Sequence, residues 1–127
     1  MTTADATLLQ FGQAAGMPGL AFDARGQAVF RSESGRLIGM ERADGEILVY
    51  AAIPLDYDAG AWLLEACKRA HHRNLDDWPV QPALREHDGR RYLMALARIA
   101  EADFTEVRLR QSLEYLSRWL DDLREAR

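Results

Sequence analysis

Two apolar runs on either side of Asp44-Gly45 dominate the hydrophobic pattern of the chain. This dipeptide readily adopts the positive φ angles of a tight hairpin turn. In the second run, positions 47, 49, 51 and 53 are apolar, and so are positions 48, 50 and 52. A strand with one face in water is apolar on one side only. We therefore expect this strand in the middle of a sheet, with something covering each face.

The periodicity of the whole chain predicts three helices and five strands in the order α-β-β-β-α-β-β-α. Helices are expected at 4–16, 59–73 and 103–127, and strands at 28–32, 37–40, 47–53, 83–86 and 91–99. The last helix has the strongest signal, because leucines recur every four or three residues from Leu109 to Leu123. This order predicts an α+β fold, a single domain over residues 1–127 with a five-stranded antiparallel sheet.

Short polar side chains mark the expected helix starts, because their oxygens accept from the free amides of the first turn. The candidates are Thr3 or Asp5, Asp58, and Asp103 with Glu106. Asn74 is a plausible stop for the second helix, since it tolerates the left-handed conformation. Gly12 weakens the first helix by about 1 kcal/mol relative to Ala. That helix should therefore depend on tertiary packing, or pack closely through Gly12.

Composition narrows the class of partner. The chain has 127 residues and a net charge of -4, which argues against nucleic acid and against an anionic membrane surface. No apolar run approaches the length of a membrane span, and the N-terminus lacks the basic region of a signal peptide. A single cysteine rules out an intramolecular disulfide. These features predict a cytoplasmic protein.

No motif predicts catalysis, a metal or a cofactor. Cys67 falls among apolar residues in the middle of the second helix, so we expect a buried structural thiol rather than a nucleophile. His71 and His72 are adjacent and point to different sides of a helix, which does not suit the converging ligands of a zinc site. Apolar surface is what the chain has in excess. A second copy or a peptide from another protein could cover the second sheet face, unless the sheet curls and the last helix covers it.

The chain resembles the class I type III secretion chaperones of the Tir-chaperone-like family. Size, acidity and element order agree, and three stretches are similar: 8–16 followed by Leu20-Ala21-Phe22-Asp23, 63–75 with its closing Asn74-Leu75, and 93–99 followed by Asp103 and the leucine-rich helix. The resemblance covers about residues 8–123. The proline-containing segment 78–82 departs from the family pattern.

This resemblance implies a cytoplasmic homodimer without enzymatic activity. Such chaperones bind the N-terminal region of a secreted effector in extended form and keep it soluble and competent for secretion. The effector-binding residues carried over from the family are Leu8, Phe11, Leu20, Phe22, Phe30, Ile38 and Met40. Those carried over for the dimer interface are Trp62, Leu63, Ala66, Trp78 and Leu84.

Two other functions stay open at this point. A chaperone-like protein of the same build could sequester a regulator instead of an effector. A small α+β enzyme could assemble a site around His87, Asp88 and Tyr92. The enzyme would need a deep polar pocket with a titratable group whose pKa is perturbed.

Overall fold

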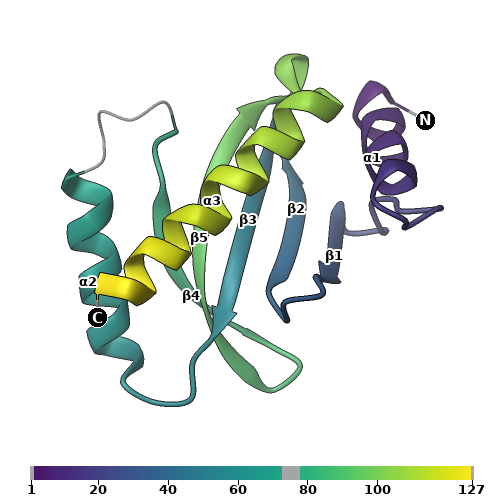
Figure 1. The fold of residues 1–127 in the computed structure, drawn as a ribbon. Coiled ribbons are helices and arrows are strands. Elements are labelled where there is room, and N and C mark those ends of the chain that lie inside the picture. Colours follow the sequence, from purple (N-terminus) through teal and green to yellow (C-terminus); the bar gives the residue numbers. More distant parts are fainter. Residues whose placement is uncertain (1, 73–77, 127) are drawn as a thin grey trace.

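The computed structural model describes residues 2–72 and 78–126 (Figure 1). Within this part of the chain, three α-helices, a short 3-10 helix and five strands follow the predicted order, and the α+β prediction is confirmed. The elements are α1 (Thr3–Ala14), β1 (Gln27–Arg31), β2 (Leu37–Ala43), β3 (Glu46–Pro54), α2 (Ala59–His72), β4 (Gln81–His87), β5 (Arg90–Ala100), η1 (Glu101–Asp103) and α3 (Glu106–Ala126). The predicted helix stop at Asn74 lies outside the described residues.

The strand after Asp44-Gly45 is at the centre of the sheet, as predicted. The spatial order is β1-β2-β3-β5-β4, and every neighbouring pair is antiparallel. Asp44 and Gly45 both have positive φ, 41° and 82°, which suits a two-residue hairpin turn between twisted strands. Strand β3 therefore has a hydrogen-bonded neighbour on each side, and β1 and β4 form the two edges.

One face of the sheet is covered by helices. Helix α3 lies across the middle of the sheet, and α1 and α2 lie toward its two edges (Figure 1). The odd-numbered apolar positions of β3, from Ile47 to Ile53, face this side and are buried against the leucines of α3. All five leucines of the predicted seam, from Leu109 to Leu123, are buried. All three α-helices thus share one core with the same side of the sheet.

The opposite face is also buried, although none of the helices contributes to it. Its cluster consists of Leu37, Tyr50, Ala52, Tyr92, Met94 and Leu96. Long polar side chains from neighbouring strands lie over these residues. Arg85 lies over the Tyr50 ring at 5.4 Å and pairs with Glu41 at 3.2 Å, and Arg31 donates to the Tyr92 hydroxyl at 3.0 Å. The sheet's own side chains therefore bury these six residues within the chain, and the alternative that the last helix covers this face is wrong.

Gly39 makes room for the largest side chain of this second face. Gly39 and Tyr50 are directly opposite each other in β2 and β3, and the Tyr50 ring occupies the space where a Cβ on residue 39 would sit. Tyr50 is only 1% exposed, and this burial raises the pKa of its hydroxyl. A glycine in the middle of a strand is here a packing requirement.

Two predicted helix caps are wrong by a few residues. Helix α1 is capped by Thr2, whose Oγ1 accepts from the Asp5 amide at 3.2 Å while the Asp5 carboxylate accepts from the Thr2 amide at 2.7 Å. Asp5 is thus the second half of a capping box. Helix α3 is preceded by Thr105, which accepts from the Arg108 amide at 3.1 Å. Asp103 instead ends η1, a turn that the helical pattern does not distinguish from the helix itself.

Cys67 is exposed, which corrects the prediction of a buried thiol. Helix α2 turns Trp62, Leu63, Ala66 and Ala70 toward the core, so Cys67 points away from the sheet. The prediction for Gly12 is confirmed. A Cβ at this position would lie 2.6 Å from the Leu20 Cβ, so Gly12 lets the segment after α1 pack closely against the helix.

Gly39→Ala should lower the free energy of unfolding by about 1–3 kcal/mol, because the added methyl group overlaps the Tyr50 ring. The measurement is urea denaturation at a fixed protein concentration. Gly60→Ala is the matched control, since nothing lies within 4 Å of a Cβ there. In helix α2 that change should be neutral or stabilising by up to about 1 kcal/mol.

Replacing Tyr50 with Leu should remove much of the penalty of the Gly39→Ala change. The sum of the losses in the free energy of unfolding of the two single variants should exceed the loss of the double variant by at least about 1 kcal/mol. Strictly additive losses would show that the glycine is not needed to accommodate the ring.

Candidate functional site

Three of the residues predicted to bind an effector are in the core of this structure. Leu8, Ile38 and Met40 are buried in the cluster between the sheet and the helices. Ile38 and Met40 lie on the face of β2 that the helices cover, so neither can contact a partner in this conformation. A role for these three in binding would require α1 or α3 to leave the sheet.

The other four predicted residues gather at one edge of the molecule. Phe11 of α1, Phe30 of β1, and Leu20 and Phe22 of the connection between them are half-buried against the core. The Phe11 and Phe30 ring centroids are 6.5 Å apart. We call these four residues the α1–β1 surface. The structure therefore brings together four of the seven sequence-predicted residues, from segments separated by up to 19 positions.

Strand β1 places an open sheet edge beside this surface. It pairs with β2 on one side only. Its five residues extend over about 17 Å. On the outer side, the Gln27 amide and carbonyl already bond to Asp23, so the main-chain groups of Val29 and Arg31 are the ones that can pair with another extended chain. The strand edge can therefore bind the backbone of a peptide, and the neighbouring aromatic side chains can contact the peptide's side chains.

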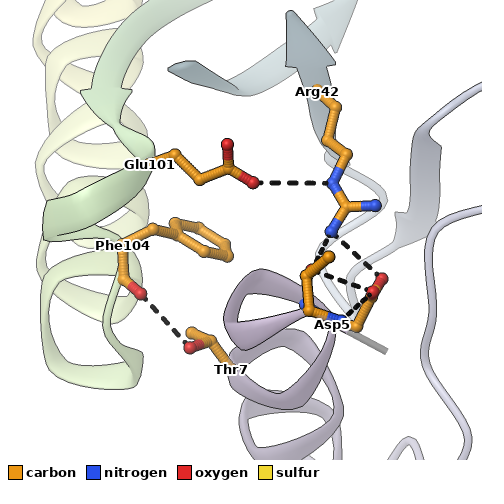
Figure 2. A network of polar contacts seen from close by, with 6 residues as sticks. Asp5, Thr7, Arg42, Glu101 and Phe104 are labelled. Atoms are coloured by element: carbon orange, nitrogen blue, oxygen red, sulfur yellow. Dashed lines mark hydrogen bonds and ion pairs between the residues drawn. The ribbon is translucent and has the colours of Figure 1, made fainter. Parts of the chain in front are cut away.

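Arg42 on β2 ties the start of α1 to the sheet (Figure 2). Its guanidinium is 3.3 Å from the Asp5 carboxylate and 3.9 Å from that of Glu101, and it also contacts the Thr2 hydroxyl. Hydrogen bonds from the Thr2 amide and hydroxyl, followed by the contact with Arg42, lower the pKa of Asp5. Arg42 also lies 4.7 Å from the centre of the Phe22 ring, so one side chain positions both α1 and the α1–β1 surface.

A second contact fixes α1 against the end of the sheet. The buried Thr7 hydroxyl donates to the Phe104 carbonyl at 3.2 Å (Figure 2). These two residues are 97 positions apart in the chain. The Arg42 and Thr7 contacts therefore fix the N-terminal half of α1 before any partner binds.

The residues predicted for a dimer interface are mostly turned inward. Trp62 and Leu63 are half-buried against the core, and Ala66 and Trp78 are buried. The Trp78 ring is further covered by the Arg108 guanidinium at 3.9 Å. Of the five predicted residues, only Leu84 on edge strand β4 is exposed, at 37%.

The outward side of α2 carries a different apolar strip, which the sequence analysis did not identify. Ala61, Leu64 and Cys67 are exposed at steps of three residues along the helix, and Leu64 is 56% exposed. Because positions 62, 63 and 66 are equally apolar, the periodicity of α2 fits two overlapping faces. The regular spacing of the apolar positions 61, 64 and 67 is the sequence feature that could have revealed this strip.

The residues considered for an enzyme do not form a catalytic arrangement. His87 Nε2 lies 3.5 Å from the exposed Asp88 carboxylate at the β4–β5 turn, where Asp88 has a positive φ of 51°. The Tyr92 hydroxyl accepts from Arg31.

Among the described residues, no three His, Cys, Asp or Glu side chains are grouped to hold a metal ion. No described helix has the length and apolarity needed to cross a bilayer.

No protein family model and no curated protein matches the sequence. Several solved structures are similar in fold. The HopA1–SchA chaperone–effector complex has a chain with a TM-score of 0.69 and 18% identity, over 94% of this chain and 91% of that one. The structure of the Yersinia pestis type III secretion chaperone SycH in complex with a stable fragment of YscM2 has a chain with a TM-score of 0.64 and 14% identity. The match covers 95% of this chain and 97% of that one.

The same fold also occurs with a different suggested role. YbjN of E. coli, a candidate transcription regulator, has a TM-score of 0.56 and 15% identity, over 93% of this chain and 86% of YbjN. None of these three structures is described as that of an enzyme. The predicted resemblance is thus confirmed at the level of the fold: the chain folds as type III secretion chaperones do.

Proposed function

We propose that this protein is a cytoplasmic chaperone that binds the N-terminal region of a secreted effector and keeps it soluble and competent for secretion. The observation that carries this proposal is the α1–β1 surface, in which four half-buried apolar side chains lie beside an edge strand whose outer side no other strand pairs from Val29 to Arg31. The likeness to SchA and SycH, both seen in complexes, supports it. The protein has no catalytic role in this proposal.

Binding would combine two physical effects. An extended effector segment adds a strand to β1 through main-chain hydrogen bonds and places alternate side chains against Phe11, Phe22 and Phe30. The contacts of Arg42 and the close packing at Gly12 hold this surface in place. Because the chaperone is already ordered, the entropy cost of binding falls mainly on the effector.

We further propose that the protein is a homodimer through the outward side of α2. Leu64 is the most exposed aliphatic side chain among the large hydrophobic residues of the described chain, and small neighbours at positions 61 and 67 let a second helix approach closely. A two-fold axis at this face would place each α2 against its copy, the isologous arrangement that most dimers adopt.

A second candidate function is sequestration of a regulator. The likeness in fold to YbjN, a candidate transcription regulator, supports this alternative, and the same surface could hold a regulator segment. Pull-down from the source cell followed by partner identification separates the two functions. A partner that is itself secreted supports the chaperone role, and a retained transcriptional partner supports the alternative.

Phe11→Glu should weaken partner binding at least about tenfold, because it places an unpaired charge where an apolar side chain would be buried. The partner is obtained by co-expression with the product of the neighbouring gene, and affinity is measured by calorimetry with its N-terminal segment. Val107→Glu is the matched control, since Val107 on α3 is 49% exposed and lies outside the α1–β1 surface. Equal affinity of wild type and Phe11→Glu would refute the proposed site.

Leu64→Asp should convert the dimer to a monomer, because two carboxylates would face each other across the two-fold axis. The mass is measured by sedimentation equilibrium, with Val107→Asp as the control. Mild oxidation should also link two wild-type chains through Cys67, the only cysteine, and not two Leu64→Asp chains. A dimer that survives Leu64→Asp and forms no such link would mean that another face mediates assembly.

A further inference from the structure

A cleft opens at the end of the sheet where β3 leads into the loop before α2. Its volume is about 690 Å³, and ligand sites typically have about 300–1,000 Å³. Its walls come from the β1–β2 turn, the β3–α2 loop, the β4–β5 turn and the C-terminal part of α3. It contains none of the predicted effector-binding residues, and Trp62 is the single residue that it shares with the predicted dimer interface.

The cleft is positively charged, whereas the chain as a whole has a net charge of -4. Its charged lining residues are Arg31, Arg36, Arg90 and Arg124, with Asp56 and Asp121. Four arginines against two aspartates leave an excess of two positive charges. A local field opposite in sign to that of the rest of the surface attracts a ligand of complementary charge.

The arginines are engaged within the chain to different degrees. Arg36 is 2.7 Å from the Asp121 carboxylate, and Arg90 is 3.4 Å from that of Asp56, in an exposed and therefore weak pair. Arg31 donates to the neutral hydroxyl of Tyr92. Within the described residues, neither Arg31 nor Arg124 has a carboxylate partner. These two guanidinium groups can donate hydrogen bonds to carboxylates of another molecule.

The remaining lining decides what kind of anion fits. Tyr57, which is 76% exposed, and the half-buried Trp62 form its accessible apolar wall, whereas Ile53 and Leu55 are buried behind them in the core. A peptide that combines acidic with apolar side chains matches both the charges and the wall.

The cleft also continues the proposed binding edge. Strand β1 ends at Arg31, and Arg31, Ser34 and Gly35 line the cleft. A chain that pairs with the outer edge of β1 therefore reaches the cleft where the strand ends. We infer that the cleft binds an acidic stretch of the same partner polypeptide, directly next to the segment on β1; this inference rests on the proposed function.

The test uses a synthetic peptide in which Glu alternates with Leu and which carries a fluorescein label. Its binding to the full chain is measured by fluorescence anisotropy. We expect the peptide to bind and its affinity to fall as salt rises from about 50 to about 300 mM. The Arg31→Gln/Arg124→Gln double variant should bind at least about tenfold more weakly. Arg25→Gln/Arg118→Gln is the matched control, because both residues are exposed, carry the same charge and lie outside the cleft.

Arg31 also supports Tyr92, so circular dichroism must show that the double variant is folded. If it is not, Arg124→Glu alone, at an exposed position on the last turn of α3, should still weaken binding and serves as the test. Equal weakening by the cleft and control variants, or no binding of the acidic peptide to the wild-type chain, would overturn the inference.

The same variants separate this inference from the proposed function. If the natural partner binds and is weakened by Phe11→Glu but not by Arg31→Gln/Arg124→Gln, the cleft inference fails and the chaperone function stands. If no partner binds while the acidic peptide still binds through the arginines, the proposed function fails, and the cleft is an acidic-peptide site that serves another polypeptide.

Discussion

The central strand β3 sets the main constraint on this molecule, because it is apolar on both faces and each face must be removed from water. The helices satisfy one face, where Ile47 to Ile53 pack against the leucines of α3. No helix reaches the other. That face is closed by the Tyr50 ring in the space that Gly39 leaves, under Arg85 and its partner Glu41. The packing of Tyr50 on Gly39 therefore lets one layer of helices suffice.

This solution moves the binding surfaces to the rims of the sheet. With both faces filled, two groups of accessible apolar side chains lie along the edges: the α1–β1 surface beside β1, and the strip around Leu64 on α2 near β4. The arginine cleft lies at one end of the sheet, next to the end of β1. A partner can thus run along an edge and into the cleft without opening the core.

The proposed activity needs binding surfaces and no reacting group. The titratable groups with a clearly displaced pKa have structural causes. Hydrogen bonds from the main chain lower the pKa of Asp23 in its turn and of Asp5 in the α1 cap, and burial raises that of Tyr50. These contacts stabilise the start of α1, the turn before β1 and the packing of the second sheet face. What they provide to function is a preformed surface, which lowers the cost of ordering on binding.

The sequence by itself determined the order of the elements, the central position of β3, the hairpin at Asp44-Gly45 and the buried leucine seam of α3. Those features follow from local periodicity and turn chemistry, which a single segment carries in full. Only the tertiary structure decided which of the two apolar sides of α2 is buried, and so exposed Cys67 and Leu64. It also placed Ile38 and Met40 in the core, and assembled the cleft from segments far apart in the chain. These outcomes depend on how segments pack against one another, and no local pattern records that.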